Sequence, residues 1–224
     1  MSFDTSAYLR RATGRAKSDV ANKLVSMLLH DASKKGCATL KMSVGDSQYT
    51  EAVARVFGSN CCYCGRLLET DRAAVEHLDG MNRFRIGLHI PGNVIVACTR
   101  CNREKRRDDQ REALVLAASG WECFLSHDST RCPAKCKTCA YWRSIWPDAA
   151  ECKKNLGDAC KRIVNFRANY LAAIQWGEKA RVGLRQEMDS IYRNCQRFAV
   201  EQMQAASNRM FQNGFGEEKT PKPD

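Results

Sequence analysis

Two pairs of cysteines constrain this chain of 224 residues more than any other feature of its sequence. Each pair has the spacing C-x-x-C: Cys61 and Cys64 stand in "CCYCG", and Cys98 and Cys101 stand in "CTRCN". A C-x-x-C turn can direct two sulfur atoms toward one ion, and tetrahedral Zn²⁺ accepts four such ligands. The sequence therefore predicts a structural zinc site that closes over the 33 residues between the two pairs.

Two alternatives to this zinc site follow from the same residues. Cys62 can replace its neighbour Cys61 as a ligand, although the resulting C-x-C geometry is tighter, or the four thiols can be unrelated and simply buried. The chain has 13 cysteines, no apolar run of about 18 residues, and an N-terminal segment without the apolar core of a secretory signal. We therefore expect a cytoplasmic protein without a membrane partner, in which reduced thiols favour metal sites over disulfides.

The charge of the chain is strongly positive and unevenly distributed. Lysine and arginine outnumber aspartate and glutamate by 36 to 25, which gives a net charge of +11 and a pI near 9.1. This surplus favours a polyanionic partner, nucleic acid before an acidic membrane surface. Residues 131–185 hold 12 basic residues against four acidic ones, so this stretch is a candidate docking face. The alternative is a solvated basic surface that serves solubility.

Helical periodicity marks the N-terminal part of the chain. The pattern predicts a helix over 18–36 that ends at Gly36, and a shorter helix over 46–58 that is capped by Asp46. Each helix would bury one apolar face. These faces are Val20, Leu24, Met27 and Leu28 in the first helix, and Tyr49, Val53, Val56 and Phe57 in the second.

The C-terminal part is also periodic. The pattern predicts a helix over 157–177, bracketed by glycines at both ends, and a long last helix over 180–214. Their apolar stripes are Ile163, Phe166, Tyr170 and Ile174, and Leu184, Met188, Ile191, Cys195 and Phe198. Packing within this chain is the favoured use of the last helix, because the repeat slips after its final member. A homodimer or partner seam is the alternative.

The segment between these helical parts has a different pattern. Three short β-like runs occupy 61–68, 73–78 and 93–98, and a basic stretch that can form a helix follows over 99–110. Four motifs stand along it in the order C-C-Y-C, V-E-H-L, G-N-V-I-V and C-T-R-C-N-R-E-K. In this order they resemble the HNH endonucleases of the ββα-metal superfamily, in the version whose two C-x-x-C pairs hold a structural zinc. The resemblance covers residues 57–108.

The resemblance implies a role for each polar residue of the motifs. His77 would be the general base that takes a proton from the attacking water, a task that suits a neutral imidazole. Glu76 and Asn102 would hold one catalytic Mg²⁺ or Mn²⁺, since hard ions prefer oxygen ligands. Asn93 would brace the loop and orient His77. The helix would also carry phosphate contacts, namely Arg103, Lys105, Arg106 and Arg107.

The chain departs from the family pattern at two places. Asn102 stands where many members have histidine, and either side chain can coordinate the ion. The segment between His77 and Asn93 has no proline soon after the histidine, and it contains His89, to which the resemblance assigns no role.

A second cysteine group lies in the basic region, where Cys132, Cys136 and Cys139 stand within eight residues. Two interpretations stay open: a second zinc site, or reduced thiols packed around "YWRSIWPD". The candidates for a fourth ligand are Cys123, His127, Cys152 and Cys160. In a zinc module, Lys135 and Lys137 would be phosphate contacts.

The expected fold is therefore α+β, with a zinc-stapled ββα-metal (HNH) core embedded between N- and C-terminal α-helical regions. The expected regions are 1–58 (helical), 59–110 (nuclease core), 111–160 (basic and cysteine-rich), 161–214 (helical) and 215–224 (a disordered tail). The expected function is metal-dependent hydrolysis of DNA phosphodiester bonds in restriction or antiphage defence. The alternatives are a zinc-dependent nucleic-acid-binding module, and a nuclease subunit that a defence-system partner activates through the C-terminal helix.

Overall fold

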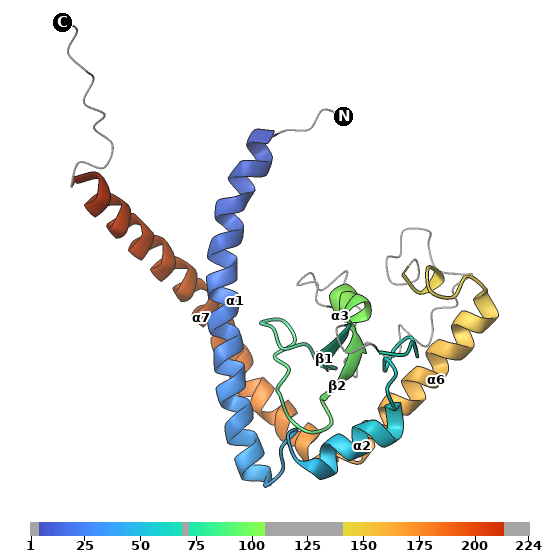
Figure 1. Ribbon diagram of the computed structural model, residues 1–224. Helices are drawn as coiled ribbons and strands as arrows, with labels where there is room; N and C mark the ends of the chain where they lie inside the picture. Colours follow the sequence, from blue (N-terminus) through green and yellow to red (C-terminus); the bar gives the residue numbers. More distant parts are fainter. Residues whose placement is uncertain (1–4, 69–71, 106–140, 213–224) are drawn as a thin grey trace, which may run out of the picture. The chain divides into compact units, whose positions relative to one another are not determined.

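The computed structural model describes residues 5–68, 72–105 and 141–212, and in this part the protein is an α+β structure, mostly helical, with one small sheet (Figure 1). The chain divides into two compact units, one formed by Met1–Val25 with Glu187–Asp224 and the other by Ser26–Gln186. The second unit contains the sheet and both C-x-x-C pairs. The five predicted regions stay a prediction. No helix in the described ranges is long and apolar enough to cross a membrane.

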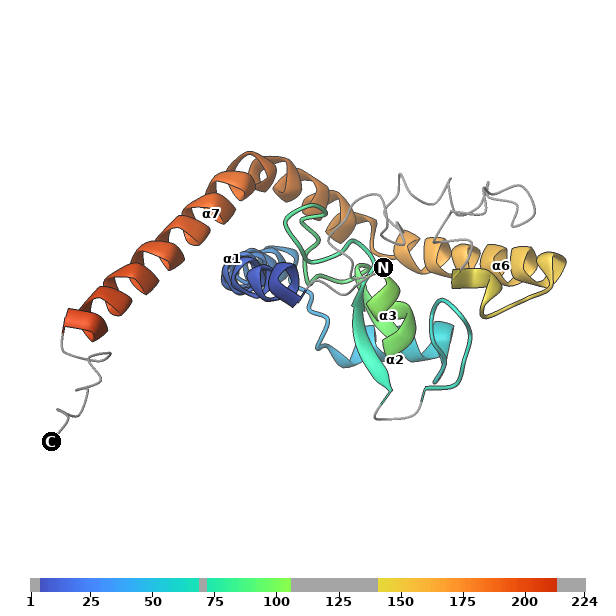
Figure 2. The same cartoon turned by 90° about the horizontal axis from the view of Figure 1, so that it is seen from above.

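The sheet is an antiparallel hairpin of β1 (Ala73–His77) and β2 (Val94–Cys98). Helix α3 (Thr99–Lys105) follows β2 without a break and lies along the hairpin in both views (Figures 1 and 2). The predicted strand–strand–helix order of the middle segment is confirmed for these elements. The first β-like run, 61–68, forms no strand: its first part is a turn from Cys61 to Gly65, which has a φ of 67°, and an isolated β-bridge joins Leu67 to Asn60.

The two faces of the hairpin have different environments. Residues that pair across antiparallel strands share a face, and successive residues point to opposite faces. Glu76 pairs with Ile95, and both are buried; His77 pairs with Val94 on the other face, where Val75 is 60 % exposed. The neighbouring glutamate and histidine of the V-E-H-L motif therefore point to opposite sides of the sheet.

Helix α1 (Thr5–Leu40) is longer than predicted, and its buried face differs. Val20, Leu24 and Met27 are exposed, whereas the buried positions are Ala21, Val25, Leu29 and Ser33. Gly36 does not end the helix. A Cβ atom at Gly36 would lie 2.3 Å from the ring of Trp176, so the glycine permits a close approach of this ring.

Helix α2 (Ser47–Phe57) agrees with the prediction in its bounds and in the burial of Tyr49 and Phe57. Asp46 precedes the helix but does not cap it through its side chain, which accepts a hydrogen bond from the amide of Ser43 instead. The predicted glycine-bracketed helix is wrong in its bounds, because α6 (Ala149–Ala168) and α7 (Leu171–Gln212) meet at residues 169–170 and both glycines lie inside helices. Asp148 caps α6 by accepting a hydrogen bond from the amide of Glu151. The predicted burial of Ile163 and Phe166 is confirmed.

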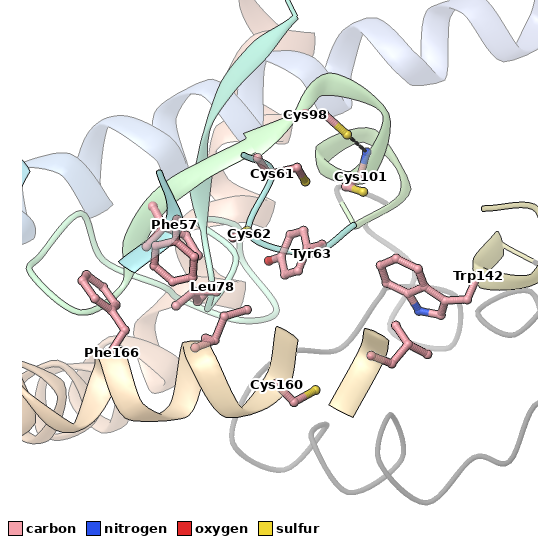
Figure 3. Close-up of a cluster of buried hydrophobic side chains, with 14 of the residues drawn as sticks. Phe57, Cys61, Cys62, Tyr63, Leu78, Cys98, Cys101, Trp142, Cys160 and Phe166 are labelled. Carbon is pink, nitrogen blue, oxygen red and sulfur yellow. Dashed lines mark hydrogen bonds between the residues drawn. The ribbon is translucent and has the colours of Figure 1, made fainter. Parts of the chain in front are cut away.

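One hydrophobic core joins α2, the hairpin, the C-x-x-C turns and α6 (Figure 3). Its largest aromatic members include Tyr63 and Trp142, which are almost fully buried, and Phe57 and Phe166, whose rings meet edge to face at 5.4 Å. Trp146 stacks on Trp142 at 5.6 Å. Cys152 and Cys160 also lie in this core on α6, where both are almost fully buried. The core thus places the cysteine cluster against the hairpin.

Candidate metal centre and histidine site

The sulfur atoms of Cys61, Cys64, Cys98 and Cys101 all lie within 4.8 Å of one another. The Sγ atoms of Cys64 and Cys98 are 3.9 Å apart. Tetrahedral zinc with Zn–S bonds of about 2.3 Å separates its sulfur ligands by about 3.8 Å, so the spacing fits such an ion. The predicted cluster of four cysteines is confirmed, and it can hold a metal ion such as zinc.

The four thiols share hydrogen bonds, so their pKa values move in opposite directions. Hydrogen bonds, the largest contribution from Cys101, lower the pKa of Cys61 far below the ordinary thiol value and lower that of Cys98 to about 6, whereas the pKa values of Cys64 and Cys101 are raised. Thiolates are the form in which cysteine binds zinc. Cys62, the alternative ligand, is buried but is not one of the four clustered residues; its amide donates to the carbonyl of Val96 on β2.

Neighbouring groups hold the cluster in place. The amide of Cys101 donates to Sγ of Cys98 at 3.4 Å, and the hydroxyl of Tyr141 donates to Sγ of Cys101 at 2.9 Å. Figure 3 shows the sulfur atoms of Cys61, Cys98 and Cys101 turned toward one another beside the ring of Tyr63. Hydrogen bonds to ligand sulfurs fix their orientation, so the cluster has outer support as well as ligands.

Residues 78–93, here called the β1–β2 loop, form an ordered structure that Asn93 closes. The Asn93 side chain donates to the carbonyls of Asp79 and Leu88 at 3.2 and 2.7 Å, and its Oδ1 accepts from the amide of Asp79 at 2.7 Å. The Tyr49 hydroxyl donates to the Val94 carbonyl and accepts from the Gly92 amide. Asn93 therefore braces the main chain of the loop through three hydrogen bonds.

A buried ion cluster ties the same loop to the C-terminal helices. Asp79 is 4 % exposed, and its Oδ2 accepts from Nη2 of Arg167 on α6 and from Nη2 of Arg181 on α7, each at 3.0 Å. The negative charge of Asp79 also faces Arg85 of the loop, whose pKa is lowered mainly by burial. Because two cations share one carboxylate, this contact fixes the loop at both helices.

His77, the expected general base, is half-buried at the end of β1. Its Nε2 lies 2.9 Å from Nδ1 of His89 in the β1–β2 loop. The ring of His30 on α1 lies 5.7 Å from that of His89. Three of the chain's four histidines thus gather from three separate segments.

The two expected ligands of a catalytic ion are both largely buried. Asn102 is 8 % exposed on α3, and its Nδ2 donates to the carbonyl of Val75 at 3.0 Å. Glu76 is 2 % exposed on the core face of β1. Burial, and after it the negative charge of Glu76, raise the pKa of Tyr63 well above its ordinary value. The carboxylate thus lies near a buried phenol, on the opposite face of the hairpin from His77.

Of the predicted phosphate contacts, only Arg103 has a described side chain, and it is exposed on α3. Lys105 ends the same helix, but its side chain lies outside the described set. The remaining predicted phosphate contacts and the second cysteine group lie outside the described residues. They are Arg106, Arg107, Lys135, Lys137, Cys132, Cys136 and Cys139.

Sequence reasoning missed the residues that hold the β1–β2 loop. Asp79 follows the V-E-H-L motif by one position, and its polarity next to a glycine is typical of a turn, so burial was not expected. Arg167 and Arg181 stand in helical stretches where arginine usually faces solvent. Ser33 and His30 stand in a helix whose buried face was predicted at other positions.

Comparison with known proteins adds no relative: no protein-family model, no curated protein and no solved structure matches this chain.

Proposed function

We propose that this protein is an HNH-type phosphodiesterase that hydrolyses the backbone of DNA. The proposal rests on the cysteine cluster beside a hairpin and a helix. His77 lies on the hairpin, Asn102 on the helix, and Asn93 at the end of the loop between the two strands. These are the residues and the element order that the sequence resemblance requires. The net charge of +11 supports a polyanionic substrate.

His77 has the chemistry of a general base in this proposal. An imidazole with a pKa near neutrality can accept a proton from a water molecule that attacks a phosphate. The side chain is half-buried, which leaves part of it open to solvent. Asn93 supports it indirectly by closing the loop that follows β1.

Glu76 and Asn102 offer the oxygen atoms that a hard divalent ion binds, but the burial of Glu76 keeps such an ion from reaching its carboxylate. Carboxylate and amide oxygens are the ligands that Mg²⁺ and Mn²⁺ prefer, and Mg²⁺ keeps several of its waters. Glu76 is 2 % exposed on the core face of β1, so its carboxylate is closed to a hydrated ion from solvent. The arrangement thus does not fit an ion bound by Glu76 and Asn102, and we derive no step of the reaction through such an ion.

The burial of Glu76 favours a second candidate function. A protein that keeps the zinc-held hairpin but buries its carboxylate can bind nucleic acid without cutting it, or can become active when a partner rearranges the hairpin. In either case DNA binding is retained while the isolated chain shows no cleavage. Use in restriction or antiphage defence stays a prediction under both candidates.

The experiment incubates zinc-loaded wild-type protein with supercoiled plasmid in Mg²⁺, in Mn²⁺ and without an added divalent ion. Omission is better than excess EDTA, because a chelator also removes structural zinc. We expect nicked or linear DNA with the wild type and intact plasmid with His77→Ala. Asp31→Asn, on the exposed surface of α1, is the control for a substitution outside the proposed site.

Two results would separate the candidates. Cleavage that persists in His77→Ala would remove the histidine from the mechanism and contradict the proposed site. No cleavage by any protein, together with a gel shift of DNA by folded wild type, would replace the nuclease with the binding module or the partner-activated subunit.

A further inference from the structure

His89 is held on both sides by helix α1. Its amide donates to Oγ of Ser33 at 2.8 Å, and its carbonyl accepts a hydrogen bond from Sγ of Cys37 at 3.7 Å. Ser33 is 2 % exposed and also donates to the carbonyl of Leu29. Helix α1 therefore fixes the main chain at His89 through two successive turns.

The loop fixes the same residue from the other direction. Asn93 binds the carbonyl of Leu88, the residue before His89. Gly177 on α7 approaches the loop so closely that a Cβ atom would lie 2.8 Å from Cδ1 of Ile90, the residue after His89. The backbone on both sides of His89 is thus constrained, so the direction of its ring toward His77 is a feature of the fold.

The charge state of His89 decides what its ring can do. Burial, and after it the charge of His30, lower the pKa of His89 below its ordinary value. A neutral imidazole has one donor nitrogen and one acceptor nitrogen. With Nδ1 of His89 at 2.9 Å from Nε2 of His77, a single hydrogen lies between the two rings.

We propose that His89 is a positioning residue for His77: its Nδ1 accepts a hydrogen bond from Nε2–H of His77, so that a neutral His77 carries its proton on Nε2 and its lone pair on Nδ1. The tautomer of a histidine is set by the hydrogen bond that its other nitrogen makes. The reverse arrangement, with His89 as donor, would occupy the Nε2 lone pair of His77 and place the proton on its Nδ1. The catalytic meaning of this assignment rests on the proposed function, but the tautomer itself does not.

The first test is the ¹⁵N NMR spectrum of the histidine rings in the zinc-loaded full chain at pH 8, which distinguishes N–H from lone-pair nitrogens. We expect Nε2–H at His77 in the wild type, and a mixture of both tautomers in His89→Ala. His89→Gln supplies an amide oxygen as acceptor and should restore Nε2–H. His127→Ala assigns the signals of the fourth histidine ring.

An Nδ1–H tautomer at His77 in the wild type, or a His77 spectrum that is the same in His89→Ala, would overturn the proposal. Both substitutions at His89 keep its amide and carbonyl, to which α1 binds, so the loop anchor is retained. Ser33→Ala removes the anchor instead, and should broaden or shift the His89 and His77 ring signals together while leaving the zinc content unchanged.

The second test is cleavage by the same variants. His89→Ala should lower kcat about 10- to 100-fold with KM nearly unchanged, a typical effect of removing a residue that orients a functional side chain. His89→Gln should recover a large part of kcat. If the wild type cuts no DNA, the proposed nuclease function is contradicted, while the NMR spectrum still tests the hydrogen bond between His77 and His89. If His89→Ala cuts as fast as wild type, the positioning role fails and the nuclease stands.

Discussion

The cysteine cluster and the β1–β2 loop flank the same hairpin but are held in opposite ways. The cluster consists of four cysteines on two short turns, and a single metal ion would bind all four sulfur atoms. The loop is held by contacts from distant segments: Ser33 of α1, Arg167 of α6 and Arg181 of α7. The cluster, which can hold a metal ion such as zinc, would therefore depend on that ion, whereas the loop depends on contacts with the helices. The two regions should fail under different perturbations.

The largest expected effect is loss of the cluster. Cys101→Ser should release one zinc per chain, and the free energy of unfolding should fall by several kcal/mol, because a structural zinc site contributes about 10 kcal/mol to folding. Zinc analysis of the purified proteins and thermal denaturation followed by circular dichroism measure both effects.

Cys62→Ser is the matched control, since Cys62 is equally buried but is not one of the clustered residues. Equal zinc content in wild type and Cys101→Ser would contradict the assignment of Cys101 as a ligand.

The next effect should come from the ion cluster of the loop. Asp79→Asn leaves the guanidinium groups of Arg167 and Arg181 without their counter-charge in a buried site. Removing one partner of a buried ion pair costs about 3 kcal/mol. Urea denaturation should show this loss, while hydrogen exchange should become faster in the β1–β2 loop and zinc content should stay at the wild-type value.

Asp31→Asn provides the comparison, because Asp31 pairs with Lys35 on the exposed surface of α1. Such surface pairs contribute little. If the two substitutions lowered stability equally, the loop would not depend on the buried cluster.

A smaller effect is expected at the approach of α1 to Trp176. Gly36→Ala places a methyl group where the ring lies 2.3 Å away, so the ring must move. Such overpacking costs about 2 kcal/mol. Gly183→Ala on α7 meets no atom within 4 Å and should stabilise that helix by up to about 1 kcal/mol. Thermal denaturation should show a lower melting temperature for Gly36→Ala and a higher one for Gly183→Ala. A change in the same direction for both variants would contradict the close approach of Trp176 to Gly36.

The smallest effect concerns pH. The pKa of His89 is lowered from the ordinary value of 6.5, mainly by burial, so the unfolded chain binds this proton more tightly than the folded chain does. The resulting stability is complete above about pH 6.5 and is lost as the pH falls from there through the lower pKa of the folded protein. Urea denaturation at pH 5.5 and 7.5 should show a smaller change in His89→Gln than in wild type. An identical change in both proteins would remove His89 as the cause.

The predictability of the two regions follows from how they are held. The cluster could be predicted because C-x-x-C spacing alone sets its geometry, and Glu76, His77 and Asn102 were placed on the right elements by short-range patterns. The partners of the loop could not be predicted. Asp79 meets Arg181 across 102 positions, and no local periodicity relates them.

The helix errors have a related cause. The pattern over 18–36 contains apolar residues on two adjacent faces, and the structure buries Ala21, Val25 and Leu29 and leaves Val20, Leu24 and Met27 exposed. Local periodicity does not decide between two such faces, because contacts with distant segments select one of them. Gly36 was interpreted as a helix end because glycine often follows a helix, whereas here it makes room for Trp176.

The most direct test of the proposed nuclease is single-turnover cleavage of a 5′-labelled DNA duplex by zinc-loaded protein, with the ends of the product identified. The proposed nuclease should give products with a 5′-phosphate and a 3′-hydroxyl, formed by the wild type and by Cys62→Ser but not by His77→Ala. Products formed at the same rate by His77→Ala, or none from a wild type that holds its zinc and binds the duplex, would contradict it.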